Sequence, residues 1–231
     1  MKLLELFSGS RSIGKVAEKK GMQVFSVDNI AYPDTNWVGD ILDWDYRLNE
    51  MQGGTLKELY VPDVIWASPP CTAFSVACIG RKWVQGKIFT PKTEDAKVGI
   101  KIMLKTMDII KFYLEKNPNL IWYIENPRGK MRKAPQWSSI NHVRHTVSYG
   151  DVRMKPTDIW TNDFNWTPRV MCKPFKYNEN GEVIDRHCHH EPSPRSTQQG
   201  GTQKLKDNFE RSKIPSELCE VIMTSAYETI N

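Results

Sequence analysis

The order of apolar segments along the chain constrains its fold more than any other feature. Five short segments are typical of β-strands, namely LLELF (residues 3–7), MQVFSVD (22–28), WVGDI (37–41), PDVIWA (62–67) and LIWYIEN (120–126). Between the last two, residues 94–116 predict a long amphipathic helix, because apolar residues recur there at helical spacing: Val98, Ile102, Met103, Met107, Ile110 and Leu114. Strands that alternate with helices predict an α/β fold with a largely parallel sheet.

Shorter patterns complete the expected order of elements. Ser12 is expected to cap a helix that runs to about Lys20, and HTVSY and PTDIWTN predict two further strands. The last helix is expected within SKIPSELCEVIMTSAYETI, with Pro215 in its first turn. We therefore divide the chain into a main domain (1–161), a small loop-rich insert (162–203) and a C-terminal helix that packs back on the main domain (204–231).

Composition excludes several classes of protein. With 231 residues, of which 39% are hydrophobic, the chain can bury one substantial core. No apolar run is long enough for a signal peptide or a membrane span, so we expect no membrane contact. Five cysteines, an odd number without regular spacing, argue against a disulfide framework and favour a reducing cytoplasm.

Positive charge is concentrated in the middle of the chain. Residues 81–133 carry 13 basic and 5 acidic side chains, whereas the whole chain has a net charge of only +5. Such a segment is suited to a polyanion such as nucleic acid, although a solvated lysine-rich face gives the same pattern. Within it, four basic residues follow the last predicted strand: Arg128, Lys130, Arg132 and Lys133.

Polar and reactive residues follow the predicted strands at the point where each strand ends. In order, these positions carry FSGS, Asp28, Asp40, SPPC and the triplet Glu125-Asn126-Pro127. Ligands of open α/β sheets bind beyond the carboxyl ends of the strands, and a carboxylate after the second strand suits a ribose diol. Taken alone, FSGS is a weak signal, because an ordinary strand-to-helix turn has the same composition.

In this order and spacing, five motifs resemble those of DNA cytosine-5 methyltransferases. They are FSGSRSIG, VDN, VGDI, DVIWASPPCTAFS and WYIENPRG, which together span residues 3 to about 130. The first three are found in many methyltransferases, whereas PPC followed by ENP is specific. VSYGDVRMKPTDIW resembles the next strand pair of the family more loosely.

The resemblance implies a Rossmann-like class I methyltransferase fold that binds S-adenosylmethionine and acts on double-stranded DNA, as part of restriction–modification in a bacterial or phage-infected cell. It implies cofactor contacts at Phe7, Ser8, Gly9, Asp28, Asn29, Asp40, Ile41 and Pro69. It implies Cys71 and Glu125 as catalytic residues. Contacts to the target base are implied at Pro70, Asn126, Arg153 and Lys155.

Chemistry explains why a cysteine and a carboxylate are needed together. Carbon 5 of cytosine becomes nucleophilic only after a thiolate, here Cys71, has attacked carbon 6. Glu125 can hydrogen-bond the base and protonate ring nitrogen 3 as charge develops. Because a stacked base is out of reach, the cytosine must be flipped out of the duplex.

Three departures from the family pattern stand out. Ser10 and Arg11 follow Gly9, where the family has a further glycine. Lys155 and Thr157 align with two family arginines, so Lys155 or Arg153 is expected to take over their contact. The segment for target recognition is short, so either the sequence preference is weak or a partner protein supplies it.

Two other functions and one metal site remain as alternatives. An amino-group methyltransferase carries an aromatic residue after S-P-P, where this chain has Cys71, and a methyltransferase-like protein that only binds nucleic acid needs no cysteine. We expect no metal. A zinc site in the insert, at a spacing that matches no standard zinc motif, would use Cys172, His187, Cys188 and His190.

Overall fold

A seven-stranded sheet forms the centre of the computed structural model, which describes residues 1–48, 50–51, 54–55, 60–147, 149, 156–169, 176–185 and 213–230. The strands lie in the order β3 (Trp37–Val38), β2 (Gln23–Asp28), β1 (Lys2–Leu6), β6 (Val64–Ala67), β7 (Ile121–Pro127), β9 (Thr157–Thr161) and β8 (Val143–Val147). Neighbours from β3 to β7 are parallel, and only β9 runs against its two neighbours. The predicted α/β fold with a largely parallel sheet is therefore confirmed.

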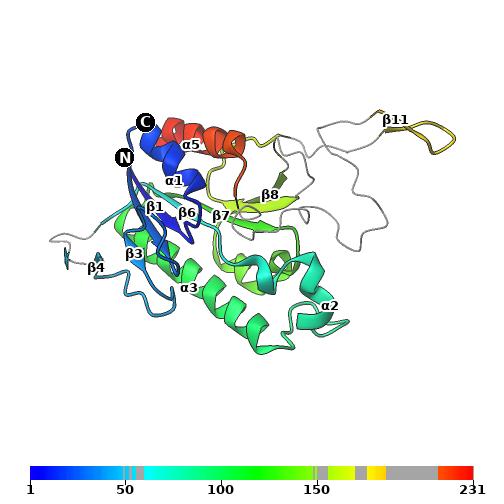
Figure 1. Cartoon of the computed structure of the whole chain (residues 1–231), viewed down its shortest axis with the longest axis horizontal. Helices are drawn as coiled ribbons and strands as arrows, with labels where there is room; N and C mark the ends of the chain where they lie inside the picture. Colours follow the sequence, from blue (N-terminus) through cyan, green and yellow to red (C-terminus); the bar gives the residue numbers. More distant parts are fainter. Residues whose placement is uncertain are drawn as a thin grey trace.

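Helices cover both faces of this sheet (Figure 1). α1 (Ser12–Lys19) and α5 (Ser216–Ile230) lie on one face, and α3 (Glu94–Lys116) lies on the other. Side chains alternate along each strand, so β1 places Leu3 in the core under α1 and α5 but Leu4 and Leu6 in the core under α3. The sheet thus divides two hydrophobic cores, which leaves the strand ends as the accessible edge.

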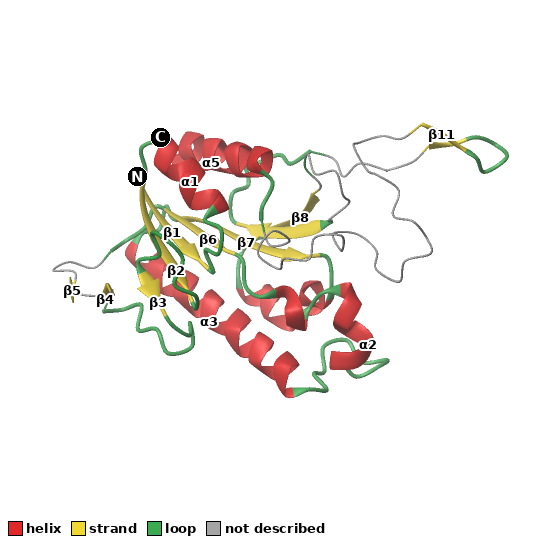
Figure 2. Ribbon diagram, viewed as in Figure 1, coloured by secondary structure: helices red, strands yellow, loops and turns green. Residues whose placement is uncertain are grey.

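Several short elements complete the described structure (Figure 2). They are β4 (Glu50–Met51), β5 (Gly54–Thr55), α2 (Ile79–Lys82), β10 (Lys176–Tyr177) and β11 (Val183–Asp185), together with 3-10 helices η1 (Cys71–Ala73), η2 (Val76–Cys78), η3 (Lys130–Lys133) and η4 (Pro135–Ser139). Each has at most five residues, too few to establish a hydrophobic period that sequence patterns could detect.

The predicted helix ends differ in how closely they match the structure. α3 has the predicted bounds, and the hydroxyl of Thr93 caps it by accepting from the amide of Ala96. The predicted cap at Ser12 is wrong, because Arg11 takes the capping position in a left-handed conformation without a side-chain cap bond. Pro215 immediately precedes α5, and its carbonyl oxygen accepts from the amide of Cys219 at 3.1 Å, so it takes part in the first turn as predicted.

The third predicted strand is shorter than its sequence indicated. β3 ends at Val38, so Asp40 lies two residues beyond the strand instead of at its end. Of the predicted insert, residues 162–169 and 176–185 lie within the described part, where β10 and β11 pair as an antiparallel hairpin. Among the helices of the described residues, none is apolar over a length sufficient to cross a membrane.

Glu5 is a charged residue in the middle of a core strand. Its side chain is 2% exposed and lies between β1, α1 and β2, where it accepts hydrogen bonds from the amide of Gly14 at 3.0 Å and the hydroxyl of Ser26 at 3.1 Å. Burial raises the pKa of Glu5 from 4.5 to about 7, although these donors and Arg11 act in the opposite direction. The folded protein therefore binds a proton at Glu5 more tightly than the unfolded chain does.

We expect Glu5 to make stability fall as pH rises. Between about pH 4.5 and about pH 7 the folded state holds the proton that the unfolded state has lost, so the free energy of unfolding decreases across this window. Relative to Glu5→Gln, the wild type should lose up to about 3 kcal/mol, measured by urea unfolding at a series of pH values. Glu115→Gln, on an exposed part of α3, should follow the wild type, and a constant difference between wild type and Glu5→Gln would contradict the assignment.

Candidate active site

The turn after β1 is the first component of the site, and its backbone is unusual. Phe7, Gly9 and Arg11 have positive φ angles of 59°, 47° and 54°, a conformation that only glycine adopts without cost. The turn is attached to the end of β2, because the amide of Ser8 donates to Val27 O at 3.1 Å and the amide of Gly9 donates to Asp28 Oδ2 at 2.8 Å. The hydroxyl of Ser8 is buried and has no hydrogen-bond partner within the described residues.

Asp28 connects this turn to the loop that follows β2. One carboxylate oxygen accepts from Gly9 and the other accepts from the amide of Ile30 at 2.9 Å, while the side chain is 8% exposed. Each oxygen keeps a further lone pair for a ligand. Asn29, the next residue, is exposed.

A backbone hydrogen bond joins the loop that contains Asp40 to the end of β2. The amide of Gly39 donates to Asp28 O at 2.9 Å, which brings the loop after β3 beside the end of β2. The side chain of Asp40 is exposed and accepts from the amide of Leu42 at 2.9 Å, and Ile41 is buried in the core under α3. The expected cofactor residues from Phe7 to Ile41 therefore gather at one edge of the sheet.

Cys71 lies just beyond β6 on a short turn. Pro69 is buried and Pro70 is exposed, and Cys71 begins the 3-10 helix η1, with its side chain half-buried. The carbonyl oxygen of Cys71 accepts from the amides of Phe74 and Ser75, at 3.0 and 2.9 Å. Proline at the preceding position fixes the backbone that leads into this turn.

Glu125 and Asn126 lie on the neighbouring strand at the same edge. β6 and β7 are parallel with Ala67 opposite Ile124, so Glu125 and Asn126 extend β7 beyond the end of β6 while they still pair with β9. Glu125 is 5% exposed, and Asn126 is fully buried. The amide nitrogen of Asn126 donates to Pro69 O at 2.8 Å, which joins β7 directly to the turn before Cys71.

The two segments are joined a second time by their backbones. Ser75 and Gly129 form an antiparallel bridge, and the amide of Lys130 donates to Phe74 O at 2.7 Å. A Cβ atom added at Gly129 would overlap this same carbonyl oxygen, so only glycine permits the approach. We refer to residues 74–75 and 129–130 as the backbone clamp.

A third support comes from α3. A Cβ atom added at Gly99 would overlap the methyl group of Ala73, so this glycine lets the helix pack directly against η1. Glycine is unfavourable inside a helix by about 1 kcal/mol, which is a signal that sequence reasoning could have used. The Cys71 turn is therefore held by three contacts: the hydrogen bond from Asn126 of β7, the backbone clamp, and the close packing of α3 at Gly99.

The segment that follows Cys71 folds back over this turn. Trp83 donates its indole N–H to Ala73 O at 2.7 Å, and its ring contacts Phe74 and Phe89 with centroid separations of 5.8 and 4.7 Å. Lys130 lies 5.6 Å from the centre of the Trp83 ring, and its ammonium group donates to Lys87 O at 2.9 Å. Sequence patterns identified none of these contacts.

Arg132 has a different environment from the other basic residues after β7. Its guanidinium donates to both oxygens of Asp158, at 2.6 and 2.8 Å from Nη2, and Asp158 is fully buried. The hydroxyl of Thr146 also donates to Asp158, at 2.7 Å. The charge of Arg132 is therefore paired with Asp158, whereas Arg128 and Lys133 are exposed.

Some expected residues fall outside the described part of the chain. These are Arg153 and Lys155, expected at the target base, and Cys172, His187, Cys188 and His190, the alternative zinc ligands. Among the residues that the structure does describe, no group of three or more histidine, cysteine, aspartate or glutamate side chains is arranged to hold a metal ion.

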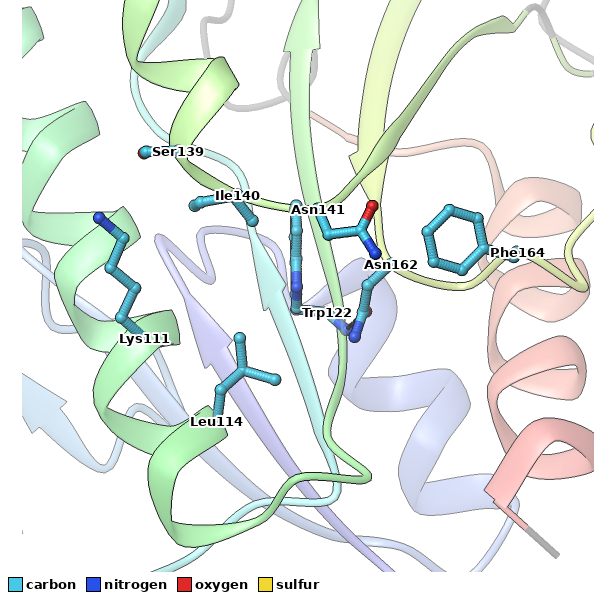
Figure 3. A pocket seen from close by; sticks show the side chains of 8 residues that line it. All are labelled: Lys111, Leu114, Trp122, Ser139, Ile140, Asn141, Asn162 and Phe164. Atoms are coloured by element: carbon cyan, nitrogen blue, oxygen red, sulfur yellow. Dashed lines mark hydrogen bonds between the residues drawn. The ribbon is translucent and has the colours of Figure 1, made fainter.

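A pocket of about 290 Å³ lies at the other end of β7 (Figure 3). Its central amide, that of Asn162, is engaged within the fold, because it accepts from the amide of Trp122 and donates to Leu120 O, both at 2.8 Å. We assign no ligand to this pocket. It is lined by Lys111, Leu114, Trp122, Ser139, Ile140, Asn141, Asn162 and Phe164.

Comparison with known proteins identifies one curated relative. The chain is 31% identical over 177 residues, 74% of its own length and 74% of the relative's, to a protein of Frog virus 3 (isolate Goorha) described as a probable DNA (cytosine-5)-methyltransferase. No family model matches the chain.

Solved structures give a more distant likeness. A putative DNA modification methyltransferase encoded within an E. coli prophage matches 74% of the chain at 15% identity and a TM-score of 0.42. A mutant of Spodoptera frugiperda DNMT2 matches 74% at 18% identity and a TM-score of 0.41. The chain spans about half the length of each, 52% and 53%, and at these TM-scores the likeness adds nothing to the fold described above.

The backbone clamp should tolerate no side chain at residue 129. We expect Gly129→Ala to lower the free energy of unfolding by about 1–3 kcal/mol, because backbone atoms of Phe74 must move to admit the Cβ atom. Gly80→Ala, in α2, is the matched control, since no atom lies within 4 Å of the added Cβ. Urea unfolding measures both, and equal stability of the two variants would show that the clamp is looser than described.

Proposed function

Because the chain belongs to the DNA (cytosine-5)-methyltransferase family, we propose that it transfers a methyl group from S-adenosylmethionine to carbon 5 of cytosine in DNA through a covalent adduct with Cys71. The observation that carries this proposal is the double connection between the Cys71 turn and the end of β7. Asn126 bonds to Pro69 O, and the backbone clamp ties the following residues together. A nucleophile and an acid on adjacent strand ends are thereby held as one unit.

Residues at the ends of β1, β2 and β3 fit the methyl donor. The buried hydroxyl of Ser8 lacks a partner within the described residues, and Asp28 has lone pairs available beside it. We propose that Asp28 and Asn29 hold the ribose and that Asp40 and Ile41 hold the adenine, with Phe7, Gly9 and Pro69 completing the site. When bound, S-adenosylmethionine supplies an electrophilic methyl group near Cys71.

Cys71 and Glu125 divide the chemistry on the base between them. The thiolate of Cys71 bonds to carbon 6 of cytosine, and the displaced electron density makes carbon 5 nucleophilic. Glu125 donates a proton or hydrogen bond to ring nitrogen 3 and so stabilises the negative charge that attack creates. After methylation, loss of the proton from carbon 5 and expulsion of the thiolate regenerate the cysteine.

Placement of the base follows from the surrounding side chains. The side-chain oxygen of Asn126 is buried without a hydrogen-bond partner in the described residues, so it can accept from an amino group of a flipped cytosine. Pro70, exposed beside Cys71, is proposed to contact the same base, together with Arg153 or Lys155. A partner protein or a weak sequence preference would compensate for the short recognition segment.

Exposed basic residues near the site suit the DNA backbone. Arg128 and Lys133 follow the end of β7, and Arg81 and Lys87 lie in the segment that follows Cys71, where both are exposed. Their charges can replace counterions on the phosphates. On the basis of the cysteine composition we propose a cytoplasmic location, in a bacterial or phage-infected cell, with restriction–modification as the setting.

Calorimetry with S-adenosylhomocysteine tests the donor site. Asp28→Ala should weaken binding roughly ten- to a hundredfold, because a buried hydrogen bond to a charged group contributes about 1.5–3 kcal/mol. Asp43→Asn removes an exposed carboxylate from the loop that contains Asp40 and should change affinity by less than about twofold. Equal affinity of Asp28→Ala and the wild type would remove Asp28 from the site.

Trapping on DNA that contains 5-fluorocytosine tests the covalent step. Fluorine at carbon 5 cannot leave as a proton does, so the adduct with Cys71 should accumulate in the presence of S-adenosylmethionine and survive denaturation. Cys71→Ser should trap nothing, and Glu125→Gln should trap slowly. Mixed-sequence DNA with the analogue makes the test independent of the unknown target sequence.

Cys78→Ser is the matched control for the trapping experiment. Cys78 is buried seven positions after Cys71, and its thiol contacts Ser75 O at 2.9 Å, a bond that a serine hydroxyl can retain. This variant should trap like the wild type. An adduct that persists in Cys71→Ser, or a methyl group found on an exocyclic amine, would overturn the assignment of Cys71 and favour the amino-group alternative.

A further inference from the structure

Arg11 is a buried arginine in the turn proposed to hold the methyl donor. Its backbone has a left-handed φ of 54°, a conformation that favours glycine. Its amide donates to Ser8 O at 2.7 Å, which closes the turn, and its carbonyl oxygen accepts from the amide of Lys15 at 3.0 Å, which begins α1. Arg11 therefore has the backbone geometry of glycine and, in addition, a long charged side chain.

The guanidinium of Arg11 contacts four separate elements. Nε donates to Ser26 Oγ on β2 at 3.0 Å and lies 4.0 Å from the carboxylate of Glu5 on β1. Nη2 pairs with Glu18 on α1, and Nη1 lies 3.4 Å from Asp34 in the loop between β2 and β3. Arg11 is 4% exposed, and its partners Ser26 and Glu5 are buried, whereas Glu18 and Asp34 reach it from the solvent side, with side chains 46% and 75% exposed.

These contacts join the two segments that flank the donor site. The turn from Phe7 to Arg11 lies on one side, and the loop after Asp28, which contains Asp34, lies on the other. Asp28 already links the two segments, through Gly9 and Ile30. The pairing of Arg11 with Asp34 is a second link between the same two segments.

The cost of removing the guanidinium of Arg11 from water must be offset by its partners. These partners include the carboxyl groups of Glu5, Glu18 and Asp34. A single ion pair rarely offsets the cost of removing both charges from water. Placing Arg11 at the start of α1 is also unfavourable, because the helix dipole is positive at that end. For the turn alone, arginine is therefore less favourable than glycine. Its side-chain contacts are the feature that glycine could not supply.

We propose that Arg11 is a positioning residue for the methyl donor: its guanidinium fixes the turn from Phe7 to Arg11 against the loop that contains Asp34. Arg11 itself does not touch the donor. Where glycine would leave the turn free to change conformation, the arginine holds it in the arrangement that places Ser8 and Gly9 beside Asp28. This inference rests on the proposed function, because it assumes that the donor binds at this edge of the sheet.

Three variants of the full chain separate positioning from simple stability. Arg11→Gly keeps access to the left-handed backbone and loses all four contacts. Arg11→Lys keeps the charge but cannot reach several partners at once. Asp34→Asn removes one contact at a side chain that is 75% exposed, so it should leave the free energy of unfolding almost unchanged.

We expect a selective effect on the methyl donor. In Arg11→Gly, the affinity for S-adenosylhomocysteine should fall and KM for S-adenosylmethionine should rise, each by about tenfold, which corresponds to about 1.4 kcal/mol. The value of kcat at saturating donor and the affinity for DNA should stay within about twofold of the wild type. Arg11→Lys should recover part of the loss, and Asp34→Asn should show a smaller change in the same direction.

Lys15→Ala is the control for loss of a positive charge from α1, since Lys15 is exposed and should leave donor affinity unchanged. If the wild type binds no S-adenosylhomocysteine, the proposed function fails and this inference fails with it. If the wild type binds and Arg11→Gly binds equally well, only the positioning role is overturned. If Arg11→Gly does not fold, unchanged donor affinity in both Arg11→Lys and Asp34→Asn overturns it.

Discussion

The backbone clamp between residues 74–75 and 129–130 is the constraint on which the rest of the candidate site depends. A 3-10 turn such as the one that begins at Cys71 is too short to hold a side chain in one place. Pairing of Ser75 with Gly129, and of Asn126 with Pro69 O, makes the loops after β6 and β7 one unit. The proposed nucleophile and the proposed acid then share a common support, which the proposed covalent mechanism on a flipped base requires.

Buried ion pairs support the two flanks of this unit. Arg132 holds Asp158 on the β9 side, and Arg11 holds Ser26 and neighbouring carboxylates on the β2 side. Such pairs contribute little net stability, because desolvation cancels much of the attraction. Their effect is to fix geometry, since removing one partner leaves a charge buried and unpaired. Both arginines lie in segments that follow a strand end, which is where the ligands are proposed to bind.

Sequence patterns identified those elements whose hydrophobic pattern lies in neighbouring residues and extends over many positions. The bounds of α3 were predicted because its apolar period persists over many turns. The placement of Asp28, Cys71 and Glu125 at one edge follows from recognising strands and assuming a parallel sheet. The prediction of Ser12 as a cap was wrong because the sequence does not show that Arg11 adopts a left-handed conformation. For α2 and the 3-10 helices the pattern is too short to detect.

The sequence by itself determined which residue types stand at the strand ends and, through its motifs, the family to which the chain belongs. It did so because strand ends and helix periods are encoded by neighbouring residues. The tertiary structure alone decided which of those residues meet: Gly129 with Phe74, Arg132 with Asp158, and Arg11 with Ser26. These contacts join positions far apart in the chain, and their closeness depends on strand order and on how closely backbones can approach, which no local pattern records.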